Sequence, residues 1–481
     1  MHSVRDGMKF DFSSAKDTGE RYDLVVVGAG ISGLASALLY RQMAGVKTKV
    51  LLIDPLDDFG GHAKRNEYRV GKRTVLGYGG SQSMQTPSYF SPAVNQLLAD
   101  IGIEPEKFEV YYDQEWADKR GLGEGIFFAK EAFGKDVLVP GGEKAADWVG
   151  KTPLSEKAKQ DLIQLIDNPP DYLPDLDRSG KLELLSRTTY KDFLLNIVKA
   201  DPQLVIYFQS STELYFGVGI EATTCLDAWG NGNPGFGGMK LGDKPYRTMS
   251  PSGRLTKTDP DDYIYHFPDG NAGIARALVR CLRPDAVPGR TMEDLVTARV
   301  DYGRLDRPNA STRIRLNSSV VRVKHLGTPG SAKEVEVTYT GPGGFQKVRV
   351  GHVILACWHR VIPYLTDELP AEQVEALNDQ QKVPLMYNNI VLRNWQAWNR
   401  LKIDSLSVKG HFWSEIGLDF PVSMGAYRFV QNPNDPIVVH FGKVMADPGK
   451  STREQSPKRA AQALRPQTPT HNSLHDRQTP T

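Results

Sequence analysis

A short apolar run followed by a glycine-rich turn is the clearest local pattern in the sequence. Residues 24–27 are all apolar, which predicts a strand covered on both faces. Glycines then stand at positions 28, 30 and 33, and residues 34–40 are rich in helix formers and contain neither Gly nor Pro. A second, largely apolar run at 49–53 is closed by Asp54 and Pro55. The pattern therefore predicts a strand, a glycine turn, a helix and a second strand.

This arrangement is typical of a Rossmann-type unit that binds a dinucleotide. One glycine allows a tight turn, one lets the backbone approach a pyrophosphate, and one lets the helix pack on the strand. The N-terminus of the helix offers free N–H groups and the positive end of its dipole to phosphates. Asp54 lies 21 residues after Gly33, where a carboxylate can accept hydrogen bonds from ribose hydroxyls. We therefore predict a dinucleotide site; the competing interpretation is a plain glycine-rich turn.

The rest of the chain predicts an α/β fold in which one domain is discontinuous. Helical patterns at 92–101, 154–166 and 190–200 lie between Gly/Pro-rich connections in 91–248, and a predicted helix at 272–282 is followed by strand patterns. The polar, proline-rich residues from Ser451 on include no aromatic side chain, which predicts disorder. We expect a flexible N-terminus at 1–20, a Rossmann-type domain at 21–90 and 250–360, an inserted mixed, largely helical substrate domain at 91–249 and 361–450, and a disordered tail at 451–481.

Composition and charge narrow the class of protein. The 481 residues include 59 Lys and Arg against 57 Asp and Glu, so we expect no nucleic-acid partner. The cysteines at 225, 281 and 357 are too few and too widely spaced for a disulfide framework or a metal cluster, and no metal site is predicted. The uncharged stretch that includes the first predicted strand and helix, 24–40, has 17 residues, fewer than the roughly 20 of a membrane-spanning helix, and the N-terminus lacks the apolar core of a signal peptide. We expect a cytoplasmic protein without a membrane span.

A second string of residues gives the sequence a resemblance to a known family. Residues 57–67 read DDFGGHAKRNE, and they follow the fingerprint VVVGAGISGL at 25–34. Further agreement comes from GYGGS at 77–81, HFPDGN at 266–271 and LACW at 355–358. Over roughly 22–455 the sequence resembles the flavin amine oxidase superfamily, and more narrowly spermidine dehydrogenase and its relatives.

The resemblance implies tightly bound FAD and oxidation of a carbon–nitrogen bond of a small-molecule amine by hydride transfer to the flavin. It assigns no catalytic residue, and the electron acceptor is unknown. Haem is left open, because the sequence contains no Cys-x-x-Cys-His motif. By position, the resemblance implies cofactor contacts from the first glycine turn (Gly28, Gly30, Ser32, Gly33), the ribose acid Asp54, the phosphate segment (Gly60, Gly61, His62, Arg65), the loop beside the flavin ring (Gly79, Gly80, Ser81, Gln82) and Val320 at the adenine.

Several of these assignments have plain structural alternatives. The glycine pairs at 60–61 and 79–80 could be ordinary turns, and residues 269–271 could be a helix cap. His62 stands where many members of the family have an arginine near the phosphates; it could equally be a satisfied surface or core imidazole, with Arg65 supplying the charge. The sequence alone leaves these alternatives open.

An acidic and aromatic stretch of sequence is the candidate amine site. A cationic amine is recognised by carboxylates and by aromatic faces. Glu213, Tyr215 and Glu221 stand near Asp227 and Trp229, and the last two lie inside the family-like string LDAWG. Asp227 and Trp229 are therefore the candidate substrate residues, although each could equally serve in packing or as a solvated group.

The sequence departs from the family after Val444. Flavin amine oxidases continue with a strand, a glycine turn and a helix that faces the flavin, and nothing after Val444 shows that pattern. We expect a truncated chain that holds FAD poorly; the alternative is that another element replaces the helix. The functional candidates are an FAD-dependent amine dehydrogenase or oxidase, a flavin oxidoreductase of a non-amine metabolite, and a catalytically impaired flavin-fold protein. A nicotinamide-dependent reductase is a weaker candidate, because the fingerprint alone does not choose FAD over NAD.

Overall fold

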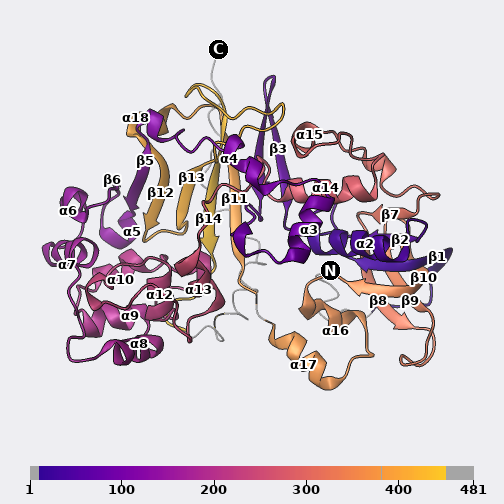
Figure 1. The fold of residues 1–481 in the computed structure, drawn as a ribbon, viewed down its shortest axis with the longest axis horizontal. Helices are drawn as coiled ribbons and strands as arrows, with labels where there is room; N and C mark the ends of the chain where they lie inside the picture. Colours follow the sequence, from indigo (N-terminus) through magenta and orange to yellow (C-terminus); the bar gives the residue numbers. More distant parts are fainter. Residues whose placement is uncertain (1–9, 381, 451–454, 456–481) are drawn as a thin grey trace, which may run out of the picture.

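Two lobes, each built around a six-stranded sheet, make up the molecule (Figure 1). The computed structural model describes residues 10–380, 382–450 and 455. The first lobe contains β1 (Lys16–Val27), β2 (Val50–Ile53), β7 (Thr312–Arg315), β8 (Ser319–His325), β9 (Val335–Gly341) and β10 (Gly344–Leu355). The second contains β5 (Gly123–Phe128), β6 (Val137–Pro140), β11 (Leu385–Leu392), β12 (Ile403–Lys409), β13 (Glu415–Leu418) and β14 (Ile437–Val444). A separate hairpin, β3 (Lys64–Val70) and β4 (Arg73–Gly79), stands upright in the upper centre of Figure 1.

The first sheet confirms the predicted Rossmann-type α/β arrangement. Its order is β7–β2–β1–β10–β9–β8, with parallel pairing from β7 to β10 and antiparallel pairing from β10 to β8. Residues 24–27 in central strand β1 are almost fully buried, as expected for an apolar strand with both faces covered. Leu24 lies opposite His352, so the sheet joins segments 328 residues apart in the sequence.

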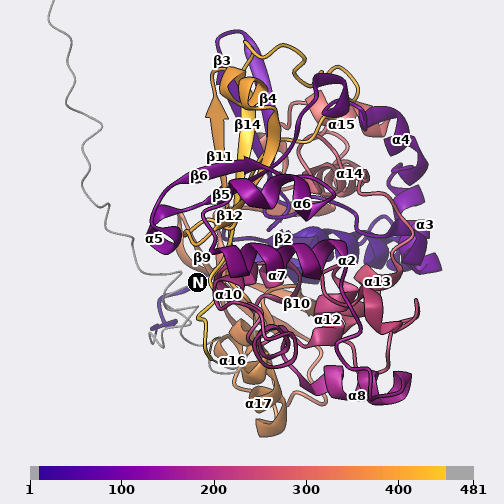
Figure 2. The ribbon, with the colours of Figure 1, turned by 90° about the vertical axis from the view of Figure 1, so that its left-hand side faces the viewer.

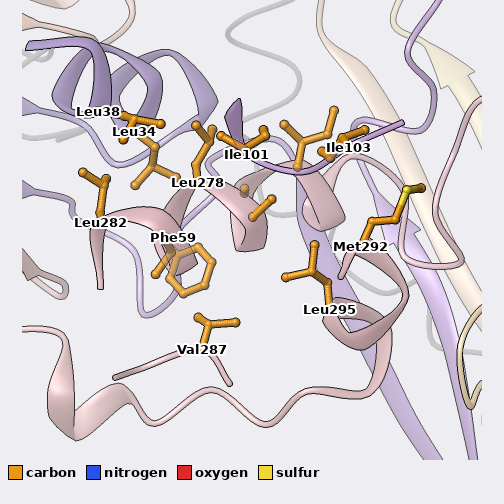
Figure 3. Close-up of a cluster of buried hydrophobic side chains, with 14 of the residues drawn as sticks. Leu34, Leu38, Phe59, Ile101, Ile103, Leu278, Leu282, Val287, Met292 and Leu295 are labelled. Atoms are coloured by element: carbon orange, nitrogen blue, oxygen red, sulfur yellow. The ribbon is translucent and has the colours of Figure 1, made fainter. Parts of the chain in front are cut away.

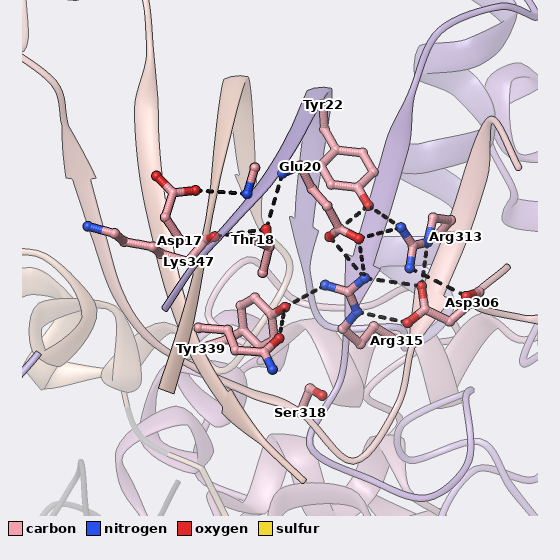
Figure 4. Close-up of polar contacts among 12 residues, drawn as sticks. Asp17, Thr18, Glu20, Tyr22, Asp306, Arg313, Arg315, Ser318, Tyr339 and Lys347 are labelled. Atoms are coloured by element: carbon pink, nitrogen blue, oxygen red, sulfur yellow. Dashed lines mark hydrogen bonds and ion pairs between the residues drawn. The ribbon is translucent and has the colours of Figure 1, made fainter. Parts of the chain in front are cut away.

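The start of β1 differs from the prediction. Residues 16–20 were expected to belong to a flexible N-terminus, but they extend β1 and pair with β10. The Glu20 carboxylate accepts hydrogen bonds from Arg313 (2.6 Å) and Arg315 (3.3 Å), and both arginines also contact Asp306 (Figure 4). Because the two arginine side chains are only 8% and 12% exposed, these ion pairs hold the segment against the sheet.

Two helices cover one face of the first sheet. α2 (Ile31–Ala44) packs on α14 (Ala272–Leu282), and α14 has the bounds that the sequence predicts. Leu34 of α2 and Leu278 of α14 lie in one buried apolar cluster (Figure 3). α15 (Met292–Thr297), α3 (Pro92–Asp100) and α4 (Phe108–Tyr111) contribute to the same cluster. α3 therefore belongs to the first lobe, although it begins beyond the predicted boundary at residue 90, because its Leu98 is buried there.

A smaller apolar layer covers the other face of this sheet. The alternate side chains of β1 and β2 pack there with residues of β8 and β9. Val361, the residue before α16 (Ile362–Leu365), and Leu365, the last residue of that helix, join the layer. α17 (Ala371–Asp379) follows. This segment was predicted to lie in the substrate domain; it packs on the first lobe because its apolar side chains are buried against the sheet.

The second lobe combines the mixed sheet β11–β14–β13–β12–β5–β6 with short helices (Figure 2). The helical pattern at 154–166 appears as α7 (Glu156–Asp167), whereas the pattern at 190–200 forms only α9 (Tyr190–Asp192) and a π-helical turn (Phe193–Ile197). The other helices are α5 (Lys130–Phe133), α6 (Ala145–Trp148), α8 (Arg178–Arg187), α10 (Gln203–Phe208), α11 (Glu213–Phe216), α12 (Cys225–Gly230), α13 (Pro251–Thr258) and α18 (Gln396–Leu401).

Two further predictions concern the C-terminal tail and membrane-spanning helices. The predicted disordered tail at 451–481 lies outside the described residues, apart from Gln455. In the described part of the chain, none of the helices combines the length and the apolar character that crossing a bilayer requires.

Candidate functional site

The glycine turn after β1 leaves the N-terminus of α2 open. Gly28 adopts a φ of 110°, and a methyl group there would lie 2.5 Å from the carbonyl oxygen of Ala356. A methyl group at Gly33 would lie only 2.0 Å from the carbonyl oxygen of Gly28, so α2 begins in direct contact with the turn. Gly30 is the N-cap residue, no described side chain caps the helix, and Ser32 in the first turn is exposed. The first N–H groups of α2 are therefore available to an anion.

Asp54, at the end of β2, holds this turn through its carboxylate. Oδ2 accepts a hydrogen bond from the backbone N–H of Ala29 (2.7 Å), and Oδ1 accepts one from Leu56 (2.9 Å). Burial raises the pKa of the Asp54 carboxyl, and the two backbone hydrogen bonds oppose that rise. The carboxylate thus lies beside the glycine turn, where the sequence places it, and its contact with a ribose stays a prediction.

A second glycine turn packs against the first. The backbone N–H of Gly60 donates to the carbonyl oxygen of Ala29 (2.8 Å), and a methyl group at Gly61 would lie 3.2 Å from Cα of Gly30. Gly60 has a φ of 102°, which glycine adopts at little cost. The glycine pair at 60–61 forms a turn, as the structural alternative drawn from the sequence proposes. This turn packs against the first glycine turn. His62, the next residue, is exposed.

A third glycine segment continues the row toward α14. A methyl group at Gly80 would lie 2.9 Å from the carbonyl oxygen of His62, and one at Gly270 would lie 2.6 Å from that of Ser81. The side-chain amide of Asn271 donates to Oγ of Ser81 (2.9 Å), so this side chain binds the 81–83 loop and does not cap α14. We call residues 28–33, 60–61, 79–80 and 270 the glycine track. It runs from the end of β1 to the start of α14.

The strand that contains Val320 reaches the Asp54 end of the glycine track. The backbone N–H of Ser318 donates to the carbonyl oxygen of Asp54 (2.9 Å), and that of Asn317 donates to Leu56 (2.8 Å). Val320 follows in β8, where its side chain is buried and the pairing with β9 is irregular. The structure therefore brings Val320 and Asp54 to the same end of the track, and the adenine contact stays a prediction.

Tyrosines and one glutamate gather at the opposite end of the track. Tyr263 donates its hydroxyl to Oε1 of Gln82 (3.0 Å), and the ring of Tyr387 contacts that of Tyr78 at 5.8 Å between centroids. Burial, followed by the charge of neighbouring groups that include Glu415, raises the pKa of Tyr263 to about 12 and also raises that of Tyr387.

Tyr215 completes this group, since burial and the charge of Glu415 raise its pKa too. Tyr215, Tyr263, Tyr387 and Glu415 are all exposed to solvent, yet protein surrounds each closely enough to raise its pKa. Accessible groups in such surroundings are suited to contact a small molecule. We call these four residues the tyrosine–glutamate cluster.

Comparison with known proteins finds a family model that matches the region of the glycine turn. Residues 26–101 match a family described as NAD(P)-binding Rossmann-like domain. The chain contains a Rossmann-like domain. The match begins within β1 and includes α2, β2 and the hairpin, that is, the first three segments of the glycine track. No curated protein sequence matches the chain.

Solved structures similar to the whole chain are distant from it. Putrescine oxidase bound to putrescine is 15% identical, with a TM-score of 0.46, and the match covers 90% of this chain and 77% of that one. Cyclohexylamine oxidase from Brevibacterium oxydans is 13% identical, with a TM-score of 0.44 and coverage of 92% and 79%. A fatty acid isomerase from P. acnes that produces CLA is 13% identical, with a TM-score of 0.41 and coverage of 92% and 82%. Their named activities differ, so none of them assigns a reaction to this chain.

Several buried polar atoms without a hydrogen-bond partner show whether the residues after the Rossmann-like domain can accommodate the rest of a dinucleotide. Nε2 of Gln82, Oδ1 of Asn271 and Nε2 of His266 are buried and have no hydrogen-bond partner among the described residues. Buried polar groups are nearly always paired in folded proteins, and an unpaired one costs about 1–3 kcal/mol. All three lie where the glycine track meets the 81–83 loop and α14. The residues present therefore fit a cofactor that extends from the fingerprint to this loop.

Arg65 has protein partners in the structure. Its guanidinium group donates to the carboxylates of Asp269 (2.6 Å) and Glu67 (3.0 Å). Asp269 precedes Gly270 of the glycine track, and its side chain is fully buried. Arg65 therefore braces the last segment of the track, and a direct contact with the cofactor phosphates stays a prediction.

Asp227 and Trp229 also have protein partners. Oδ1 of Asp227 accepts hydrogen bonds from the backbone N–H (2.8 Å) and hydroxyl (2.9 Å) of Ser250, the N-cap residue of α13. The ammonium group of Lys257 lies over the ring of Trp229, 4.1 Å from the ring centroid, in a cation–π contact. These contacts join α12 to α13. They do not support a role of Asp227 or Trp229 in substrate binding, which stays a prediction.

His266 beside the track gives a pH-dependent prediction. The imidazole is 3% exposed and contacts the rings of Tyr112, Tyr263 and Phe420, and burial, with a smaller contribution from His440, lowers its pKa to about 4. Between pH 6.5 and 4 the unfolded chain binds a proton that the folded chain does not, so stability falls as the pH falls. We expect the free energy of unfolding to drop by about 3 kcal/mol from pH 7 to pH 4 through this group.

Urea denaturation of the protein and of His266→Gln at both pH values measures this effect. Between pH 7 and pH 4, the free energy of unfolding of the variant should fall by about 3 kcal/mol less than that of the unmodified protein, because glutamine does not titrate. Equal pH dependence of the two proteins would contradict the prediction.

Proposed function

We propose that the chain is an FAD-dependent oxidoreductase that oxidises a carbon–nitrogen bond of a small amine, such as a polyamine or a specialised metabolite. The observation that carries the proposal is the glycine track. Its segments lie against one another from the fingerprint in the Rossmann-like domain to the loop at Ser81 and Gln82. A track that continues beyond the fingerprint to buried, unpaired polar atoms supports a dinucleotide with a large ring system at its far end.

Each end of the track has a distinct part in this proposal. At one end, the open N-terminus of α2 would bind the pyrophosphate, with Asp54 and the backbone near Val320 beside the adenosine. At the other, the loop at 79–82 would support the flavin ring, and Asn271 fixes that loop through Ser81. When bound, the flavin supplies the acceptor for a hydride.

The tyrosine–glutamate cluster supports an amine as the substrate. A carboxylate can pair with an ammonium group, and tyrosine faces attract a cation by about 0.5–2 kcal/mol each. Tyr263 contacts Gln82, so the cluster lies at the flavin end of the proposed site. We assign Glu415 the role of holding the amine and the tyrosines the role of orienting it and excluding water.

Absorption spectroscopy tests the cofactor. If the proposed site is complete, the purified chain, loaded with FAD and dialysed, should keep flavin bands in the range from about 300 to 600 nm, whereas the truncated chain expected from the sequence, which holds FAD poorly, would lose them. A chain that loses all flavin but binds NAD or NADP would contradict the FAD proposal and favour a nicotinamide-dependent reductase. The same spectrum reports on haem, which would add its own intense band.

Anaerobic reduction tests the substrate class. Adding spermidine or another small amine under argon should bleach the flavin bands, and Glu415→Gln should require at least tenfold more amine, because a lost charged partner costs about 1.5–3 kcal/mol. Glu143→Gln is the matched control, since Glu143 is exposed and outside the cluster. Bound flavin that no amine reduces would contradict the amine proposal and leave a non-amine substrate or an impaired protein.

A further inference from the structure

A cavity of about 810 Å³ lies outside the glycine track, between the β3–β4 hairpin, the loop after α15 and residues 426–428. In Figure 1 the hairpin stands beside α15 and above α14. The cavity is lined by seven basic and two acidic side chains, a formal excess of five positive charges, and by no residue of the glycine track. The cavity is therefore separate from the glycine track, and its lining is predominantly basic.

The floor of the cavity contains two buried arginines. Arg65 is paired with Asp269, as described above, and its partner Glu67 is one of the two acids of the lining. Arg276 of α14 is 6% exposed and donates only to backbone carbonyl groups, those of Leu295 (3.0 Å) and Ala298. Burial, and after it the nearby charge of Arg65, lowers the pKa of Arg276, and the charges of Asp269 and Asp58 oppose that shift.

The rim of the cavity adds cations that no described carboxylate neutralises. Arg69 and Lys72 come from the tip of the hairpin, Arg299 from the loop after α15, and Arg428 from the facing segment. None of the four forms an ion pair with the described residues, and Arg428 donates only to the carbonyl groups of its own loop. The remaining acid, Asp58, accepts the hydroxyl of Tyr302 (2.8 Å).

Such a charge distribution calls for an anionic ligand. Arg65 and Arg73 are paired with the carboxylates of Asp269 and Asp435, but the other five cations repel each other on one concave surface. A concave wall of low dielectric constant concentrates their field on an anion inside it. Guanidinium groups match phosphate oxygens in geometry, with two parallel N–H donors for each group. Several unpaired arginines and a lysine at the rim can contact more than one phosphate at the same time.

We propose that this cavity binds a small molecule that carries two or more phosphate groups. The site is distinct from the proposed flavin site: of its lining only Arg65 is also a predicted cofactor contact, and the unpaired cations lie on the hairpin and the facing loops. The exposed ring of Tyr302 at the edge offers a surface on which a planar group attached to the phosphates can stack.

Calorimetric titration of the FAD-saturated protein with inorganic pyrophosphate tests the proposal. We expect saturable binding of one pyrophosphate per chain, weaker binding of inorganic phosphate, and loss of affinity as salt is added. The double variant Arg299→Gln/Arg428→Gln should bind pyrophosphate at least tenfold more weakly. The double variant Arg393→Gln/Arg400→Gln removes the same charge from exposed positions outside the cavity and should bind as the unmodified protein does.

Three results would overturn the proposal. One is the absence of pyrophosphate binding, and another is an equal loss of affinity in the two double variants, which would reflect net charge alone. The third is binding only to FAD-free protein with displacement by FAD, which would place the pyrophosphate on the glycine track. Retention of flavin by the cavity variants separates this test from that of the proposed function.

Discussion

Replacing Arg65 by methionine should lower the free energy of unfolding by about 3–5 kcal/mol, because it leaves a buried carboxylate without its partner. Arg65 and Asp269 are 12% and 0% exposed, and their charged atoms lie 2.6 Å apart. The other oxygen of Asp269 is also buried and has no hydrogen-bond partner among the described residues. Urea denaturation at neutral pH measures the change.

Two variants control for this prediction. Asp269→Asn in the Arg65→Met background removes the uncompensated charge and should restore much of the stability. Arg21→Met breaks the exposed pair with Glu334 and should cost less than about 1 kcal/mol. If Arg65 also binds the cofactor phosphates, the double variant should regain stability but still hold flavin weakly. A loss of stability no larger than that of Arg21→Met would contradict the role of Arg65 as a brace.

Replacing Gly33 by alanine should abolish flavin retention and lower the free energy of unfolding by about 3 kcal/mol. The new methyl group would lie 2.0 Å from the carbonyl oxygen of Gly28 and 3.2 Å from the side chain of Val26, so α2 must move away from the turn. That movement shifts the N–H groups proposed to bind the pyrophosphate. Flavin absorbance per protein after dialysis and chemical denaturation measure the two effects.

Gly150→Ala is the matched control for this substitution. Nothing lies within 4 Å of a methyl group at Gly150, and its φ is not positive. Alanine there should leave flavin binding unchanged and alter stability by less than about 1 kcal/mol. Full flavin occupancy in Gly33→Ala would contradict the close packing of α2 on the glycine turn.

The Rossmann-like domain could be predicted from sequence because its determinants are local. The apolar run at 24–27, the glycine turn and Asp54 form one continuous pattern, and each residue type has a separate steric or hydrogen-bonding reason. The bounds of α14 could also be predicted, from residues 269–271 before it and Pro284 after it, although the Asn271 side chain does not cap the helix. The sequence also indicated the later glycine pairs, through the resemblance.

The tyrosine–glutamate cluster could not be predicted as a whole, because its members are distant in sequence; of the four, Tyr215 alone stood in the candidate amine stretch. Tyr387 and Glu415 lie on β11 and β13, which are brought together only by pairing with β14 between them. Tyr263 lies in an irregular segment just before the HFPDGN string. Its nearness to that string was the only feature of the sequence that could have indicated a role at the site. Asp227 and Trp229 were preferred because they lie inside the family-like string LDAWG, whereas the structure shows that the Asp227 carboxylate binds the start of α13.

The central position of β1 has a consequence for how the chain folds during synthesis. β1 leaves the ribosome early, but its partner β10 follows only after some 328 more residues, from Leu24 to His352. At a synthesis rate of about 5–20 residues per second, the wholly apolar segment 24–27 waits roughly 15 to 65 s for that neighbour. Long-range parallel pairing is slow to form and leaves strand edges open to aggregation meanwhile. Nascent chains should therefore depend on chaperones until the last strand of the first sheet emerges.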